Sequence, residues 1–110
     1  MTDGALVEVH VTFGSDAEAR TVARAAVEKR LAACANIVAP VHSIYWWDGA
    51  VQSQEEVAAV FKTAEARKDD LVAFIAEAHS YDVPSIIVHR PVDVNGPYAA
   101  WVEAETGAVP

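Results

Sequence analysis

The strongest constraint on the fold is a pair of long segments with period-2 alternation that meet at Asp48-Gly49. An Asp-Gly pair between two alternating segments is typical of a tight β-hairpin turn. The arms run from Cys34 to this turn and from about Val51 to Thr63. Each arm has about a dozen residues, whereas strands in globular proteins are usually ~5–6 residues long. The sequence therefore predicts an unusually long hairpin.

The tip of this hairpin carries three consecutive large aromatic residues, Tyr45, Trp46 and Trp47. Contiguous apolar side chains on a protein surface usually mark an interaction site. We therefore expect either a ligand or another copy of the chain to cover them. Pro40 lies within the first arm and has no N–H to donate to a neighbouring strand. It predicts a bulge or an edge position for this strand.

The rest of the chain alternates between strand and helix patterns. Residues 5–13 alternate apolar and polar side chains, as a strand with one buried face does. Ser15 and Glu18 form an S-x-x-E capping box, which predicts the start of a helix. The expected elements are strands at 5–13, 34–48, 51–63 and 85–89, and helices at 15–33, 65–79 and 97–105.

The order of these elements predicts an α+β fold. A βαββαβ order followed by a C-terminal helix is the ferredoxin-like, split βαβ arrangement, in which both helices cover one face of an antiparallel sheet. A chain of 110 residues has the length of a single domain, which we place at residues 1–110. The long arms overhang so small a domain, and the helix-free face still carries Val, Ile and Trp. Self-association is the expected way to bury them.

Sixteen acidic and eight basic side chains give the chain a formal net charge of −8. Nucleic-acid binding needs clustered Lys and Arg, so no nucleic-acid partner is expected. Cation binding is compatible with an acidic surface, although solubility is the favoured explanation of such a surface. No apolar run approaches the ~20 residues that span a bilayer, and no basic region precedes the first apolar run. Cys34 is the only cysteine, which suits a reducing compartment, so we expect a cytoplasmic protein with no membrane partner.

Few residues suggest chemistry by their spacing alone. The four histidines are far apart in the sequence and follow no metal-ligand spacing, so a metal site would need assembly across strands or subunits. His79 either interacts with the end of the second helix, where the helix dipole favours a cation, or binds a ligand from the loop at 79–84. Cys34 is either a small packed residue or a nucleophile. Lys62 either faces a cleft with Glu56 as its partner or is a solvated lysine. Nothing in these residues by themselves predicts an enzyme.

Several motifs along the chain together resemble the CutA divalent-cation tolerance family. The resemblance extends from Val7 to Val102, with the motifs in the family's order and spacing. The motifs that carry it are Leu31–Asn36, Ser43–Gly49, Glu56-Val57, Lys62-Thr63, His79–Pro84 and Tyr98–Trp101.

This resemblance implies a ferredoxin-like subunit in a compact homotrimer, in which the long hairpin packs against neighbouring subunits. It also implies tolerance to copper and other divalent cations, and an architecture similar to the trimeric PII-type signalling proteins. The family brings no established catalytic reaction, and clefts between its subunits are the suspected ligand sites. The positions that match its recurring polar and aromatic residues are Cys34, Tyr45, Trp47, Glu56, Lys62, His79 and Tyr81.

Two departures from the family's pattern bear on copper. Some relatives have a cysteine where this chain has Val11, and a histidine where it has Ala78. Both changes remove soft or imidazole ligands, so a tight copper site of that type is not expected.

Three functions are then to be weighed. The first is a non-catalytic trimer that binds copper or another divalent cation weakly, with His79 as the metal ligand. The second is a PII-like small-ligand sensor, and the third, least favoured, is an enzyme with Cys34 as nucleophile. For ligand binding we single out Cys34, Trp47, Glu56, Lys62 and Tyr81.

Overall fold

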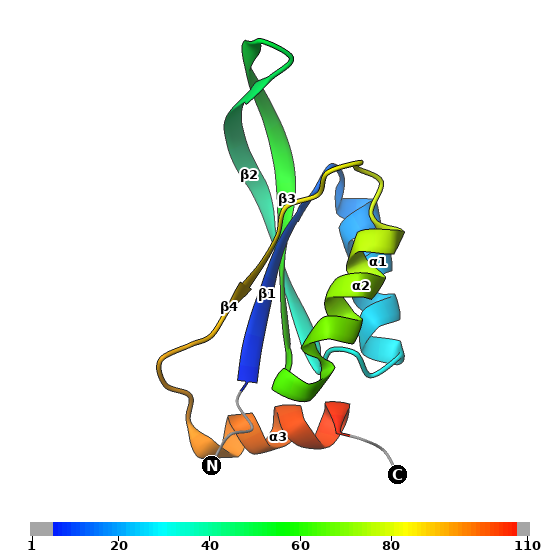
Figure 1. The fold of residues 1–110 in the computed structure, drawn as a ribbon, viewed down its shortest axis with the longest axis vertical. Coiled ribbons are helices and arrows are strands. Elements are labelled where there is room, and N and C mark those ends of the chain that lie inside the picture. The colour runs from blue at the N-terminus through cyan, green and yellow to red at the C-terminus, as the bar shows by residue number, and fades with distance from the viewer. Residues whose placement is uncertain (1–5, 108–110) are drawn as a thin grey trace.

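A computed structural model describes residues 6–107 of the chain. Four strands and three α-helices follow one another in the predicted βαββαβα order (Figure 1). The sheet has the order β2-β3-β1-β4, and each neighbouring pair is antiparallel. The predicted α+β class and antiparallel sheet are confirmed. The elements are β1 (Leu6–Phe13), α1 (Asp16–Glu28), β2 (Cys34–Trp47), β3 (Ala50–Ala64), the short 3₁₀ helix η1 (Glu65–Arg67), α2 (Lys68–Ala78), β4 (Ile86–His89) and α3 (Gly96–Thr106).

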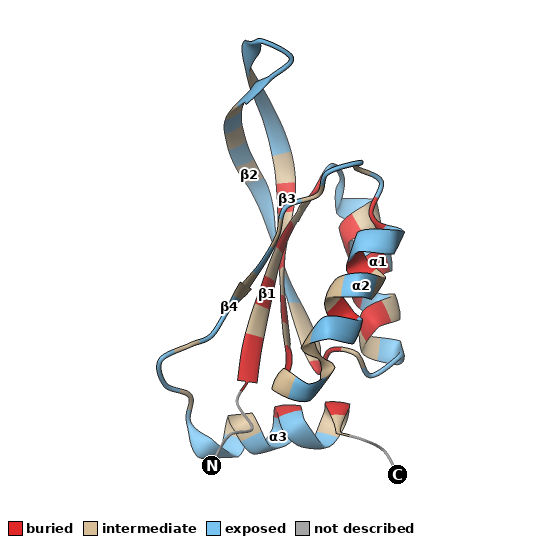
Figure 2. Cartoon of the chain, in the orientation of Figure 1, coloured by how far each residue is buried: buried red, intermediate tan, exposed pale blue. Residues whose placement is uncertain are grey.

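The hydrophobic core lies between the sheet and the pair of helices α1 and α2, which cover one face of it (Figure 2). Phe13 and Phe61 from the sheet meet Leu71 and Ile75 from α2, and all four are fully buried. Burial of one such side chain stabilises the fold by about 1.5–3 kcal/mol. Helix α3 closes one end of the sheet, where Val102 packs in a smaller cluster. No helix among residues 6–107 is long and apolar enough to cross a membrane.

Helix α1 ends at Glu28, five residues before the predicted end at Ala33. Arg30 has a positive φ of 60°, the left-handed conformation that commonly stops a helix. The N–H groups of Arg30 and Leu31 bond back to the carbonyls of Val27 and Ala26, which is the pattern of a Schellman motif. Glycine is the usual residue at this position. Because Arg30 stands there instead, the end of the helix could not be predicted from the sequence.

The hairpin of β2 and β3 has the predicted turn. Asp48 and Gly49 both have positive φ, at 55° and 79°, as the favoured two-residue hairpin turn requires. The register shifts between Val38 and Val41, and β2 is an edge strand, so both predictions made from Pro40 are confirmed.

The distal half of the hairpin projects beyond the body of the domain (Figures 1 and 2). Trp46 and Trp47 are 74% and 62% exposed there. Because neighbouring strand residues point to opposite faces, the two indoles lie on different sides of the hairpin. The described part of the chain itself therefore leaves the aromatic tip uncovered.

Candidate functional site

A hollow of about 410 Å³ lies where the hairpin passes the loop between α2 and β4. We call it the hairpin hollow. It is lined by Thr12 of β1, by Tyr45, Trp47, Gln54 and Glu56 of the hairpin, and by Tyr81, Asp82, Val83 and Ser85 of the loop.

The hairpin supplies its four residues because of its register. Asp48-Gly49 sets Trp47 opposite Ala50, and the antiparallel pairing then runs back along both arms. Side chains alternate between faces, so Tyr45 and Trp47 share the helix-free face with Gln54 and Glu56. The hollow thus follows from the turn position and the period of the strands.

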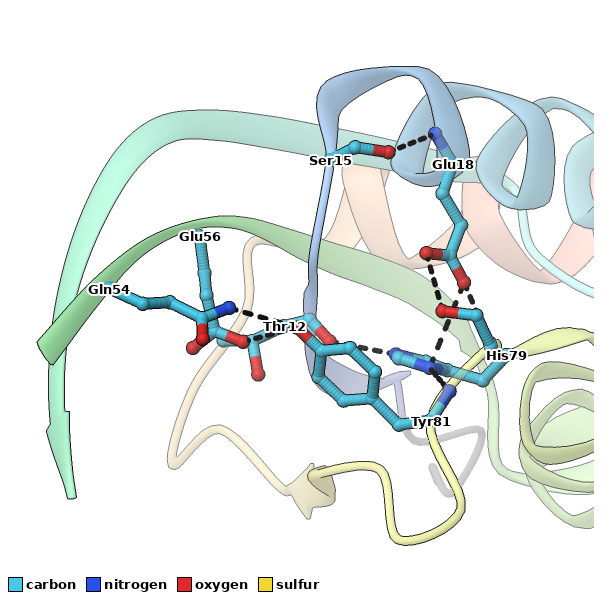
Figure 3. A network of polar contacts seen from close by, with 8 residues as sticks. Thr12, Ser15, Glu18, Gln54, Glu56, His79 and Tyr81 are labelled. Carbon is cyan, nitrogen blue, oxygen red and sulfur yellow. Dashed lines mark hydrogen bonds and ion pairs between the residues drawn. The ribbon is translucent and has the colours of Figure 1, made fainter. Parts of the chain in front are cut away.

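A chain of hydrogen bonds organises the polar side of the hollow, and Figure 3 shows its links among Gln54, Glu56 and Tyr81. The Tyr81 hydroxyl donates to Glu56 Oε2 at 2.7 Å. Gln54 Nε2 approaches the Tyr81 oxygen at 3.4 Å, and Tyr45 donates to Gln54 Oε1 at 2.6 Å. Burial, and next the contact with Glu56, raise the pKa of Tyr81 to about 12. At neutral pH this phenol therefore remains a hydrogen-bond donor to the carboxylate.

The His79 side chain links the loop to the end of β1 (Figure 3). Its Nε2 donates to the Thr12 carbonyl at 2.8 Å, and its Nδ1 accepts the Tyr81 backbone N–H at 3.1 Å. The side chain is fully buried, and its ring stacks on Phe13 with centroids 4.6 Å apart. Both ring nitrogens thus have protein partners, so a metal would have to displace one of them. The role of His79 as a metal ligand stays a prediction.

Glu18 also holds the loop in place. In the predicted capping box its carboxylate would bond the backbone N–H of Ser15, but the structure gives it other partners. Ser15 Oγ accepts the Glu18 N–H at 3.1 Å, so the N-cap itself is formed as predicted. The Glu18 carboxylate, however, accepts from the backbone N–H and the hydroxyl of Ser80 at 2.8 and 2.9 Å. The side chain that would reach back to the cap instead ties the start of α1 to the loop.

The structure divides the predicted ligand-binding residues between two places. Trp47, Glu56 and Tyr81 line the hairpin hollow together. Cys34 and Lys62 are cross-strand partners near the other end of the sheet. Six residues along β3 separate Glu56 from Lys62, which is ~20 Å in an extended strand. Of the two alternatives for Lys62, the pairing with Glu56 is therefore wrong, although the two side chains share a sheet face.

Lys62 and Cys34 have other neighbours. Lys62 donates a hydrogen bond to Asn36 Oδ1 and lines a second hollow of about 320 Å³ beside α3. Cys34 Sγ lies 3.2 Å from the hydroxyl of Tyr98. This contact, and next burial, raise the pKa of Tyr98 to about 12. The arrangement matches the packing interpretation of Cys34.

Two of the four histidines meet on the helix-free face, although they are 79 residues apart in the sequence. The rings of His10 and His89 lie with their centroids 4.1 Å apart and their planes tilted by 39°, because β1 and β4 are neighbours. His10 Nε2 also lies 3.1 Å from Glu8 Oε1. Within the described range 6–107, no three His, Cys, Asp or Glu side chains are grouped so that they could hold a metal ion.

A family model described as "CutA1 divalent ion tolerance protein" matches residues 7–105. The chain belongs to the CutA1 family. The divalent-cation tolerance protein CutA of Pyrococcus horikoshii is 38% identical over 101 residues, which cover 92% of this chain and 98% of that protein. The mouse protein CutA is 36% identical over 106 residues, 96% of this chain. This chain spans only 60% of the mouse protein's length.

Solved CutA1 structures have the same fold. The divalent ion tolerance protein CutA1 of Ehrlichia chaffeensis superimposes with a TM-score of 0.92, at 26% identity, over 97% of this chain and 100% of the other. A mutant CutA1 of P. horikoshii superimposes with a TM-score of 0.88 at 38% identity, over 93% and 99% of the two chains. The resemblance inferred from the motifs is confirmed.

Six of the nine residues that line the hollow of this CutA1-family chain were not among those singled out for binding, and Tyr45, Gln54 and Asp82 are three of them. Tyr45 and Gln54 could have been found from the sequence, because the Asp48-Gly49 turn fixes which hairpin residues share a face with Trp47. Asp82 gave no comparable signal. It belongs to a loop without periodicity, and only the tertiary contacts of His79 and Tyr81 bring it to the hollow.

Proposed function

We propose that this CutA1-family protein acts in tolerance to divalent cations, copper among them, by weak and reversible cation binding without catalysis. The observation that carries the proposal is the charge of the hairpin hollow. Glu56 and Asp82 line it, and none of its described lining residues is Lys or Arg. A cleft lined by one sign of charge concentrates ions of the opposite sign.

Glu56 is the central cation ligand in this proposal. It accepts one hydrogen bond from Tyr81 through Oε2. An ionised carboxylate offers about four lone-pair sites on its two oxygens, so it can bind a cation while Tyr81 stays in place. Carboxylate oxygens suit hard divalent ions such as Mn²⁺, and Cu²⁺ generally binds a given N/O site more tightly than other divalent ions of the first row.

We further propose that the protein works as a cytoplasmic homotrimer. The support is the set of apolar side chains that one chain leaves exposed. Val38, Ile44, Trp46 and Val51 are each more than half exposed on the hairpin, and so is Ile87 on β4. Packing the hairpin against neighbouring copies would bury them and would place the hairpin hollow beside a subunit boundary.

Calorimetric titration with CuCl₂ and with MnCl₂ tests the cation proposal. The Glu56→Gln/Asp82→Asn double variant should lose the weak binding that the wild type shows. Glu55→Gln is the matched control, since Glu55 is the adjacent β3 residue on the opposite face and lies outside the hollow. Unchanged binding by the double variant would overturn the proposed site. His79→Gln, titrated in parallel, isolates any contribution of the imidazole.

A cell-based assay tests the physiological part. A strain that lacks its own CutA1-family gene should regain copper tolerance from the wild type and from Glu55→Gln. The double variant should not restore it. Equal rescue by all three proteins would show that the hollow carboxylates have no part in tolerance.

A second function, small-ligand sensing of the PII-like kind, is favoured by the size and lining of the hollow. Its volume of about 410 Å³ lies within the ~300–1,000 Å³ usual for small-molecule sites. A thermal-shift screen of small metabolites tests it, because a ligand that binds the folded state raises the melting temperature. Absence of any stabilising compound would remove this alternative.

A further inference from the structure

We infer that the hairpin hollow takes a small organic cation, an ammonium group carried on an apolar body. This inference goes beyond the proposed function, because it assigns a second and different class of cation to the same hollow. The geometry places carboxylates and aromatic rings around one cavity, and those two kinds of group recognise different parts of such a molecule.

The aromatic lining provides the first argument. Tyr45, Trp47 and Tyr81 are three of the nine residues that line the hollow. The face of an aromatic ring carries negative electrostatic potential and attracts ammonium and alkylammonium groups, with tryptophan the most effective. Bare metal ions gain little from these rings, since they retain their water or bind oxygen ligands. The aromatic lining therefore favours an organic cation over a hydrated metal ion.

The distribution of charge provides the second argument. Glu56 and Asp82 contribute negative charge, whereas Lys62, on the same sheet face, lies ~20 Å further along the extended strand. The Tyr81 hydroxyl is committed to Glu56 at 2.7 Å, so its proton is not offered to an incoming anion. An anionic metabolite would meet two carboxylates and no compensating cation among the described lining residues. The hollow thus selects for positive charge.

The apolar side of the hollow provides the third argument. Val83 and Trp47 are 77% and 62% exposed, and both line the cavity. A molecule with an apolar body would cover these side chains and gain the free energy of removing them from water. A hydrated metal ion would leave the Val83 and Trp47 side chains exposed to water. The volume, the charge and the apolar lining of the hollow thus all favour a small organic cation.

Three compounds of nearly equal shape test the inference: benzylammonium, neutral benzyl alcohol and anionic benzoate. Each is titrated into the full-length protein at neutral pH while the indole N–H signal of Trp47 is followed by NMR. The signal is assigned with Trp47→Phe. Benzylammonium should shift it saturably, and the other two compounds should bind about tenfold more weakly or not at all, since only the ammonium meets the carboxylates and rings favourably.

Charge-removing variants sharpen the test. Glu56→Gln/Asp82→Asn should reduce benzylammonium affinity to that of benzyl alcohol, whereas Glu55→Gln should leave it unchanged. Melting curves establish that each variant is folded. Equal binding of the ammonium and the alcohol, or tighter binding of benzoate, would overturn the inference, and so would full benzylammonium affinity in the double variant.

Zinc chloride, which is diamagnetic, is titrated as a fourth arm to separate this inference from the proposed function. If zinc binds through Glu56 and Asp82 and benzylammonium does not bind, the organic-cation inference fails and the divalent-cation proposal stands. If benzylammonium binds and zinc does not, the divalent-cation proposal loses its site and the inference stands. If neither binds, both fail.

Discussion

At the scale of single residues, Tyr81 joins three parts of the chain that are far apart in the sequence. Its hydroxyl contacts Glu56 of β3, and its backbone N–H contacts His79. Gly14 leaves room for this ring, since a Cβ atom there would lie 3.0 Å from the Tyr81 hydroxyl oxygen, which is a tight contact. The position of this one ring therefore depends on the strand end, the hairpin and the loop together.

The titration of Tyr81 predicts a loss of stability in alkali. The folded state raises the pKa of this phenol from its ordinary value of 10.0 to about 12. Between these values the unfolded chain releases the proton and the folded chain retains it, so the free energy of unfolding falls as pH rises. Urea unfolding at pH 9 and at pH 11 should show a smaller decrease for Tyr81→Phe than for the wild type. Equal decreases would contradict the prediction, and Tyr98, whose pKa is also raised to about 12, accounts for part of the remaining slope.

The burial of His79 predicts a structural cost that does not depend on any metal. His79→Ala removes the bonds to Thr12 and Tyr81 and the stack on Phe13, so it should lower the free energy of unfolding by about 2–4 kcal/mol. Exposed His42→Ala should change it by less than about 0.5 kcal/mol. Denaturation in the presence of EDTA is the measurement. A cost that appears only when a divalent metal is present would instead show that His79 acts as a ligand.

At the scale of elements, α1 shows which helix boundaries can be predicted from neighbouring residues and which cannot. Its beginning was predictable, because Ser15 has an intrinsic preference for the N-cap and bonds the Glu18 N–H. Its end was not, because Arg30 adopts a left-handed conformation without a glycine. In this conformation the Arg30 guanidinium donates to the backbone carbonyl and the carboxylate of Glu105 in α3. A contact with a distant helix thus accompanies the end of α1, and no local signal in the sequence announces it.

The N-cap can be tested by itself. Ser15→Ala should lower the free energy of unfolding by about 1 kcal/mol, because the Glu18 N–H loses its acceptor at the start of the helix. Ser53→Ala on the exposed hairpin serves as the control and should have little effect. Urea denaturation followed by circular dichroism measures both. If the two substitutions cost the same, the cap contributes nothing specific.

At the scale of the whole molecule, the hairpin gives the chain an elongated shape of 47 × 26 × 21 Å. Much of its exposed apolar surface lies on this projection, through Ile44, Trp46 and Trp47. Surface of this kind is costly in water and is usually covered by a partner. The shape is therefore the basis for expecting assembly.

Native mass spectrometry tests the assembly. The wild type should have the mass of three chains, and Trp46→Glu should shift the population toward smaller species because a charge would be buried at the proposed contact. Exposed Asp70→Asn on α2, remote from the hairpin, is expected to leave the trimer intact. A monomeric wild type would contradict the proposed homotrimer. It would also contradict the proposal that the hollow lies beside a subunit boundary.

The sequence by itself determined the order of the elements, the hairpin turn and the irregularity at Pro40, because these depend on local periodicity and backbone chemistry. It also determined that Trp47 and Glu56 lie on one face, since the turn fixes the register. Only the tertiary structure decided that Tyr81 joins them, that Lys62 donates to Asn36, and that His79 uses both ring nitrogens inside the protein. The physical reason is the same in each case. The periodicity of apolar side chains in strands and helices depends on neighbouring residues. Loop positions and side-chain partners depend instead on which distant segments the core brings together.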